Sequence, residues 1–186
     1  MIELWAYIII AGIWLFIIFK WLIPVIKKRE FHEVYAAFGM GIMFSLIVLL
    51  SMVWGAGDIS PLVYCGLALY IPAAAFVILS FISLKHQGKP ESGWEPTTVL
   101  IESGVFGIVR HPLFLGSAIF TLGFILVIQS ILSAVLGVVA IFCLWMASKG
   151  EDAYNIDKFG DGYKKYMERV PMWNFFKGIF TRRDHG

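Results

Sequence analysis

Four long stretches of the sequence carry almost no charge. Lys20 alone interrupts residues 4–26, residues 34–57 and 59–84 contain no charged side chain, and residues 112–148 contain no acid or base other than Cys143. About 20 apolar residues are enough for a helix to cross a hydrocarbon core of about 30 Å. The sequence therefore predicts an all-α integral membrane protein.

The fourth stretch is too long for a single crossing. As one helix it would extend about 55 Å, at about 1.5 Å per residue. Near its middle, the polar residues Gln129, Ser130 and Ser133 predict a turn between two helices of about 17 residues each. We therefore expect five transmembrane helices, of which the last two form a tight hairpin.

The basic residues fall on one side of this five-helix arrangement. Of the 15 lysines and arginines, four lie in or just after the first stretch, three between the third and the fourth, and eight after residue 148. Basic residues are enriched on the cytoplasmic side of membrane proteins. We therefore expect the N-terminus to lie outside, and the C-terminal helical segment and any catalytic site beside it to be cytoplasmic.

Charge and cysteine content narrow the expected partners. The net charge of +2 is small, and the basic residues suit an anionic membrane face, so the bilayer is the expected partner and nucleic acid is not. Cys65 and Cys143 lie in different apolar stretches, so neither a disulfide nor a metal site is predicted. The sequence carries no indication of the oligomeric state.

Two functional portions are predicted within one membrane domain. Residues 1–90 carry the first three helices, and residues 91–186 carry a cofactor-binding connector that ends at residue 111, the helical hairpin and a cytoplasmic tail. Residues 149–169 are expected to be partly helical and broken at Gly160 and Gly162. Pro171 disfavours helix at the residue before it.

The segment Arg110-His111-Pro112 stands where the connector meets the hairpin. Proline is favourable at the first helical position, because its missing N–H would be unpaired there in any case. The helix N-terminus beside Arg110 can bind an anion through free backbone N–H groups. Polar residues at membrane depth are functional candidates, although such a pair can also simply mark the membrane boundary.

A second cluster, Glu151, Asp152 and Tyr154, follows the last apolar stretch. Because the two preceding helices form a hairpin, these acids are expected to return to Arg110 and His111, although 40 residues separate His111 from Glu151. A solvated acidic cap, or a salt bridge to Arg110, is the alternative interpretation.

A third cluster lies within residues 159–171. Tyr163, Tyr166 and Arg169 are expected on one helical face at a spacing of three. Arginine binds a carboxylate with a planar fork, and aromatic faces attract onium cations. The combination predicts a ligand with both a cationic and a carboxylate group. An amphipathic helix at the membrane surface is the alternative.

Taken in order, the three clusters resemble a known family. Residues 104–116 read Gly-Val-Phe-Gly-Ile-Val-Arg-His-Pro-Leu-Phe-Leu-Gly, and the apolar hairpin, Glu151-Asp152 and residues 159–171 follow. This set resembles the isoprenylcysteine carboxyl methyltransferases and their phospholipid-methylating relatives over residues 97–173. Phe114 stands where that family has tyrosine, and Asp152 shortens its second acid.

The resemblance implies a methyltransferase that uses S-adenosylmethionine and methylates the carboxylate of a membrane-partitioned, prenylcysteine-like acceptor. It implies two catalytic residues: Arg169 would orient the acceptor carboxylate, and Glu151 would meet polar groups of the cofactor or brace the motif. The cofactor-binding residues that it implies are Leu100, Gly104, Phe106, Arg110, His111, Pro112, Tyr154, Tyr163 and Tyr166.

Three rival functions remain open. A phospholipid amine N-methyltransferase would need a base such as Glu151 or Glu168, because an amine must lose a proton. A reductase resembling the membrane sterol reductases would bind NADPH, whose phosphates need more arginines than Arg110 supplies. A non-enzymatic membrane scaffold explains the hydrophobicity but leaves the three clusters without a role. A Rossmann methylase is disfavoured, because Gly55-Ala-Gly57 lacks the third glycine and the helix.

Overall fold

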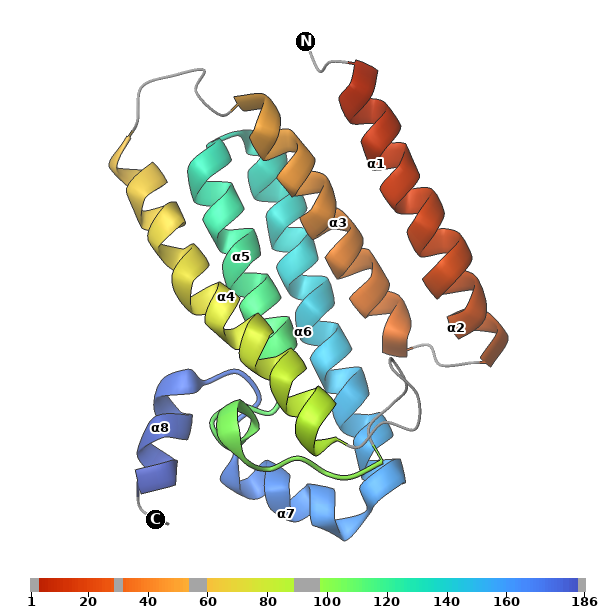
Figure 1. Ribbon diagram of the computed structural model, residues 1–186, viewed down its shortest axis with the longest axis vertical. Helices are drawn as coiled ribbons and strands as arrows, with labels where there is room; N and C mark the ends of the chain where they lie inside the picture. The colour runs from red at the N-terminus through yellow and green to blue at the C-terminus, as the bar shows by residue number, and fades with distance from the viewer. Residues whose placement is uncertain (1–3, 29–31, 54–59, 89–97, 184–186) are drawn as a thin grey trace.

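The computed structural model describes residues 4–28, 32–53, 60–88 and 98–183. Within these ranges it contains helices and connecting segments but no strand, which confirms the all-α class. Figure 1 shows long helices side by side in a bundle, with two short helices at its lower end, where the C-terminus also lies.

Five long helical rods form the bundle. The first begins as α1 (Leu4–Ile17) and continues through a π-helical turn, η1 (Ile18–Leu22), into α2 (Ile23–Lys28). The others are α3 (His32–Val53), α4 (Pro61–Gln87), α5 (Pro112–Ile128) and α6 (Ile131–Phe159). A 3₁₀ turn, η2 (Gly104–Gly107), precedes α5, and the short helices α7 (Asp161–Arg169) and α8 (Phe175–Arg183) follow α6.

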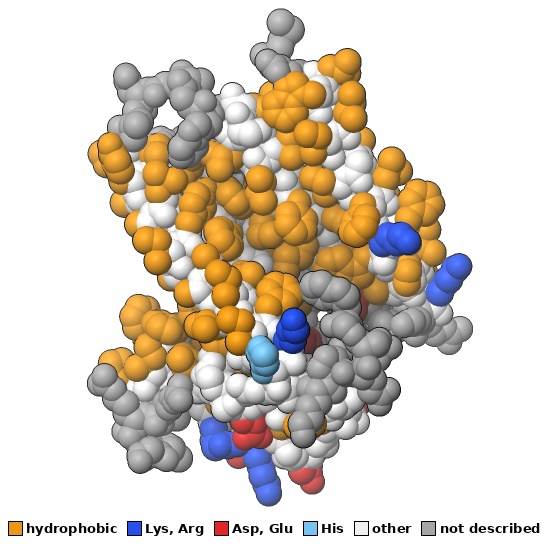
Figure 2. All heavy atoms as spheres, viewed as in Figure 1, with side chains coloured by type: hydrophobic (Ala, Val, Ile, Leu, Met, Phe, Trp, Pro, Cys, Tyr) orange, Lys and Arg blue, Asp and Glu red, His pale blue; other side chains and the backbone are white. Residues whose placement is uncertain are grey.

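The outside of the bundle is apolar. Within the described ranges, four helical segments are long and apolar enough to cross a membrane: Leu4–Lys27, Glu33–Met52, Pro61–Gln87 and Ile131–Phe159. Ile71 and Ile131, which lie on two of them, are 76% and 86% exposed. Figure 2 shows apolar side chains over most of the bundle, and acidic side chains near its lower end. Such a surface is suited to a bilayer.

The helix α5 is apolar but has only 17 residues, as the sequence predicted for the first arm of the hairpin. It is therefore shorter than the four candidate spans. That α5 makes a fifth crossing stays a prediction, as does the orientation of the bundle in the membrane.

The turn of the hairpin lies where the sequence predicted it. Gln129 ends α5 in the left-handed conformation, with φ of 51°. Ser130 caps α6: its hydroxyl accepts from the Ser133 N–H at 3.1 Å, while the Ser133 hydroxyl accepts from the Ser130 N–H at 3.2 Å. This reciprocal pair satisfies backbone donors that would otherwise be unpaired at the start of the helix.

The second arm of the hairpin is longer than predicted. Where we expected about 17 residues, α6 has 29 and continues past the apolar stretch to Phe159. Loss of hydrophobicity marks where a helix leaves the membrane, but a polar sequence can remain helical in water. The helix ends only at Gly160, whose φ of 60° favours glycine. Glu151 and Asp152 therefore lie within α6, not beyond its end.

Small residues bring α4 and α5 close together. A Cβ atom on Gly66 would lie 2.8 Å from the carbonyl oxygen of Gly123, and a Cβ atom on Gly123 would lie 3.0 Å from that of Gly66. Close approach of this kind is a common way for helices to associate in lipid, where apolar burial alone does not drive them together.

We expect Gly123→Ala to destabilise the bundle by about 1–3 kcal/mol, because the new methyl group overpacks the contact. It would also meet a ring atom of Tyr70 at 2.5 Å. Thermal unfolding in detergent measures the effect. Gly12→Ala is the matched control, since a Cβ atom there meets nothing within 4 Å. Equal unfolding temperatures for the two variants would contradict the assigned close contact.

Candidate active site

Three elements meet at the lower end of the bundle. His111 precedes α5, and Pro112 occupies the first helical position. Because α6 runs antiparallel to α5, its polar end returns to the same place. After Gly160 the chain turns into α7, which lies across the end of the bundle (Figure 1). The site is thus built from segments far apart in the sequence.

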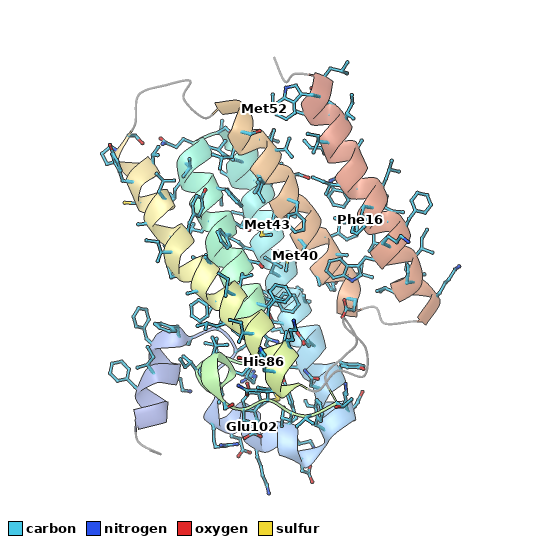
Figure 3. All side chains as sticks on the ribbon, in the orientation of Figure 1. Phe16, Met40, Met43, Met52, His86 and Glu102 are labelled. Carbon is cyan, nitrogen blue, oxygen red and sulfur yellow. The ribbon has the colours of Figure 1, made fainter. Side chains whose placement is uncertain are left out.

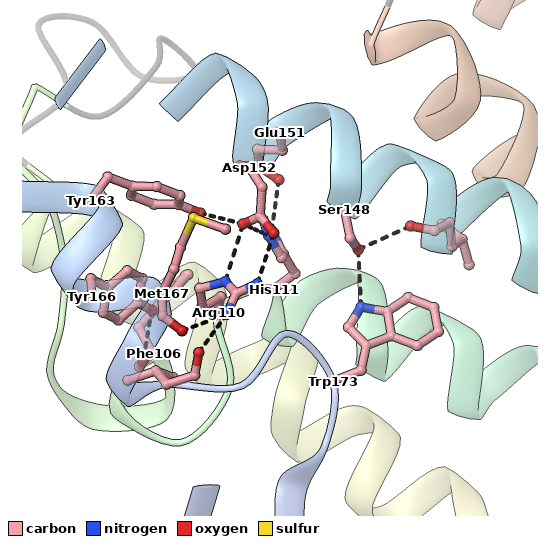
Figure 4. A network of polar contacts seen from close by, with 12 residues as sticks. Phe106, Arg110, His111, Ser148, Glu151, Asp152, Tyr163, Tyr166, Met167 and Trp173 are labelled. Atoms are coloured by element: carbon pink, nitrogen blue, oxygen red, sulfur yellow. Dashed lines mark hydrogen bonds and ion pairs between the residues drawn. The ribbon is translucent and has the colours of Figure 1, made fainter. Parts of the chain in front are cut away.

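The carboxylate of Asp152 is the centre of a buried polar network (Figure 4). Arg110 donates to it twice, from Nε to Oδ1 at 3.1 Å and from Nη2 to Oδ2 at 2.8 Å. His111 Nε2 lies 2.7 Å from Oδ1, and the hydroxyl of Tyr163 donates to the same oxygen at 2.7 Å. The predicted return of the acidic pair to Arg110 and His111 is confirmed.

His111 has a carboxylate at each ring nitrogen. Its Nδ1 lies 3.2 Å from Oε2 of Glu151, and its Nε2 contacts Asp152. Burial alone would lower the pKa of His111, but the hydrogen bonds and negative charges of Asp152 and Glu151 outweigh it and raise the pKa to about 9. The ring is therefore an imidazolium at neutral pH, and both N–H groups donate.

The raised pKa of His111 predicts a pH-dependent stability. The folded protein binds the proton more tightly than the unfolded chain, whose histidine has a pKa of 6.5. The stabilisation that comes from this tighter proton binding is therefore complete below pH 6.5 and is lost as the pH rises towards about 9. We expect the unfolding temperature to fall over this range, and His111→Gln to remove that part of the fall. A wild-type profile that matches the variant's would contradict the imidazolium assignment.

Arg110 is fully engaged within the protein. Besides Asp152, its guanidinium donates from Nη1 to the carbonyl oxygens of Val170, at 2.5 Å, and Met167, at 3.3 Å. Its backbone N–H donates to the carbonyl oxygen of Pro171 at 3.0 Å. The guanidinium is only 9% exposed. Arg110 thus ties the start of α5 to the end of α7, and its role in binding the cofactor stays a prediction.

A small cavity lies beside this network. Its volume is about 60 Å³, whereas pockets for small molecules usually enclose about 300–1,000 Å³. Its walls come from the end of α4, the connector, α6 and α7. It is lined by Leu84, Leu100, Ile101, Phe106, Arg110, Glu151, Asn155, Phe159, Tyr163 and Tyr166.

The predicted site residues divide around this cavity. Six of them line it: Leu100, Phe106, Arg110, Glu151, Tyr163 and Tyr166. The other five do not: Gly104, His111, Pro112, Tyr154 and Arg169. His111 and Pro112 are buried behind it, Gly104 begins η2 with φ of 62°, and Tyr154 lies 5.7 Å from the ammonium group of Lys158.

Two lining residues on α6 were missed by the sequence reasoning. Asn155 and Phe159 follow Glu151 at successive intervals of four, which places all three on one face of a continuous helix. The signal was present in the sequence, but it requires a helix that continues past the apolar stretch. Leu84 and Ile101 carry no comparable signal.

The face that we predicted for α7 is only partly correct. The rings of Tyr163 and Tyr166 are buried side by side, with centroids 5.6 Å apart. The Tyr166 hydroxyl donates to the carbonyl oxygen of Phe106 at 2.6 Å. Arg169 instead points outward and is 52% exposed. Six residues turn a helix through about 600°, so Arg169 lies about 120° away from Tyr163.

The chemistry of the lining fits S-adenosylmethionine, although its present volume does not. Phe106, Phe159 and the two tyrosines offer ring faces to a base or a sulfonium cation. Glu151 and Asn155 offer oxygen acceptors for hydroxyl or ammonium groups.

Comparison with known proteins agrees with this architecture. The family described as phospholipid methyltransferase matches residues 62–162, more than half of the chain. The chain belongs to this family of membrane methyltransferases. Its matched region runs from α4 to the start of α7 and so contains Arg110, His111 and Asp152 of the network, but it ends one residue before Tyr163.

The chain is also similar to the protein-S-isoprenylcysteine O-methyltransferase of Schizosaccharomyces pombe. The two are 30% identical over 74 residues, which cover 39% of this chain and 31% of the relative. The chain therefore matches about a third of the relative's length. The predicted resemblance to isoprenylcysteine carboxyl methyltransferases is confirmed. No solved structure matches the chain.

Proposed function

We propose that this protein transfers a methyl group from S-adenosylmethionine to the carboxylate of a membrane-partitioned, prenylcysteine-like acceptor. Family membership and the name of the S. pombe relative support the reaction class. The aromatic and acidic lining of the cavity supports the cofactor. We further propose that residues 91–186 form the catalytic portion, and that it lies on the cytoplasmic side, where the basic residues gather.

The state of His111 is the observation that favours a carboxylate acceptor. Both of its ring nitrogens face carboxylates, and its pKa is raised to about 9, so it cannot accept a proton at neutral pH. A carboxylate acceptor is already ionised at neutral pH and needs no base. A protonated His111 therefore supports a carboxylate acceptor, because that acceptor needs no base at this position.

Methyl transfer mainly requires alignment. The bound cofactor supplies the methyl group: the acceptor oxygen bonds to the methyl carbon as the carbon–sulfur bond breaks, sulfur keeps the electron pair, and no proton moves. Phe106, Tyr163 and Tyr166 would hold the cofactor, and Arg169 would orient the acceptor carboxylate. The Asp152 network would hold the start of α5, α6 and α7 in fixed positions relative to one another. Such positioning can contribute about 7–11 kcal/mol.

Methylation of a phospholipid amine is the second candidate. The description of the matching family favours it. An amine must lose a proton, and Glu151, whose side chain is 43% exposed, is the acid of the cavity wall that could accept it. The two candidates therefore differ in whether Glu151 is essential as a base.

Two measurements on detergent-purified protein test the proposal. Calorimetric titration with S-adenosylhomocysteine should show saturable binding; its absence would reject the cofactor. Transfer of a labelled methyl group should then be compared between a prenylated cysteine and phosphatidylethanolamine. An ester is cleaved by alkali and releases labelled methanol, whereas a methylamine is stable. Alkali-stable label found only in the phospholipid would reject the carboxylate acceptor.

A further inference from the structure

We propose that Glu102 tunes acceptor specificity by competing with the acceptor carboxylate for Arg169, an inference that rests on the proposed function. Arg169 Nη2 donates to Oε2 of Glu102 at 2.6 Å. Figure 3 shows Glu102 at the lower end of the molecule, beyond the bundle. Glu102 is not part of the sequence pattern that identifies the family, and the Asp152 network does not include it.

The ion pair joins the connector to α7, two segments that each supply residues to the cavity lining. Glu102 directly follows the lining residues Leu100 and Ile101 in the sequence, and Arg169 lies about one turn after the lining residue Tyr166 on α7, outside the lining itself. A carboxylate of the protein thus already occupies the guanidinium that we propose orients the acceptor carboxylate.

Of the two arginines whose side chains the structure describes, Arg169 is better placed than Arg110 to bind an acceptor carboxylate. The Arg110 guanidinium already makes four hydrogen bonds, two to Asp152 and two to backbone carbonyl groups. Arg169 is half exposed, and its other recorded contact is a long one, from Nε to the carbonyl oxygen of Lys165 at 3.4 Å. Its guanidinium can therefore meet an external ligand.

The Glu102–Arg169 ion pair is weak enough for an acceptor carboxylate to displace Glu102. Glu102 is 37% exposed and Arg169 is 52% exposed, and exposed ion pairs typically contribute about 0–1 kcal/mol. A bidentate carboxylate ligand can replace the single contact with Glu102 at little cost. The negative charge of Glu102 therefore raises the acceptor concentration needed for half-saturation without entering the chemical step. For an amine acceptor the same charge would act in the opposite direction.

Glu102→Gln tests the competition. With a prenylated cysteine as acceptor, we expect the KM to fall about two- to fivefold, which corresponds to ~0.4–1 kcal/mol, while kcat stays within a factor of about two. Asp161→Asn is the matched control. It removes a carboxylate of the same charge from the start of α7. Asp161 pairs with Lys164 at a distance of 2.9 Å, and neither residue lines the cavity. Its KM should not change.

The outcomes separate this inference from the proposed function. Unchanged affinity for S-adenosylhomocysteine establishes that Glu102→Gln is folded, and Glu102→Ala provides a second variant. If the wild-type protein methylates the prenylated cysteine but Glu102→Gln leaves the KM unchanged or raises it, the competition is rejected and the proposed function stands. If the wild type methylates only the amine lipid, both are rejected.

Discussion

Replacing Asp152 by asparagine is expected to collapse the candidate active site. The amide has nearly the same shape, but it removes the charge that faces Arg110 and the imidazolium of His111. Removing one partner of a buried ion pair costs about 3–5 kcal/mol, because the other charge stays buried without compensation. The amide N–H₂ group would also point towards donors.

Asp152→Asn should therefore lower the unfolding temperature markedly and abolish binding of S-adenosylhomocysteine. Thermal unfolding and calorimetric titration in the same detergent measure the two effects. Asp157→Asn is the matched control, because Asp157 is an exposed carboxylate on the same helix. If the two variants behave alike, Asp152 does not hold the site together. Asp152→Glu, which restores the longer acid of the family pattern, tests how closely the site is packed around this carboxylate.

Replacing Arg169 by alanine is expected to lower kcat/KM for a carboxylate acceptor by about 100-fold, on the order of 3 kcal/mol. The acceptor would lose the group that we propose orients its carboxylate. Affinity for S-adenosylhomocysteine should stay within a few-fold of the wild-type value, because Arg169 does not line the cavity. Parallel kinetics and calorimetry separate the two steps.

Two further variants sharpen the test of Arg169. Arg169→Lys keeps the charge but loses the planar fork, so an intermediate loss is expected. Lys165→Ala removes an exposed cation one turn earlier on α7 and should have little effect. Full activity of Arg169→Ala would reject its proposed role. Equal losses in Arg169→Ala and Lys165→Ala would point to a general effect of positive charge instead.

The two residues that depart from the family pattern, Phe114 and Asp152, lie beside or within the Asp152 network. Phe114 lies stacked beside the ring of His111, with centroids 6.2 Å apart, so the missing hydroxyl belongs to the immediate surroundings of the network. The shorter Asp152 still reaches Arg110, His111 and Tyr163 at 2.7–3.1 Å. Asp152 thus keeps its contacts with all three residues although its side chain is shorter than glutamate. Asp152→Glu tests whether the surrounding residues still leave room for the longer side chain.

Hydrophobic patterning predicted the parts of this protein that depend on local sequence. The uncharged stretches predicted the long helices, and the serines at 130 and 133 predicted the turn, because apolar length and helix capping are properties of short segments. Hairpin geometry then predicted that Asp152 would meet Arg110, since the second helix of a hairpin runs back along the first to the place where the first begins. The length of α6 was underestimated, because hydropathy marks the membrane and not the helix end.

Tertiary structure alone decided which polar groups remain available for a ligand. The sequence assigned Arg110 to the cofactor and Arg169 to the acceptor carboxylate, yet Arg110 is bound by internal partners and Arg169 is turned outward beside Glu102. Each assignment depends on the rotation of a helix and on the approach of a connector distant in sequence. The sequence shows which charged side chains are present. Whether a charged side chain is paired within the protein depends on which groups the fold brings within about 3 Å of it.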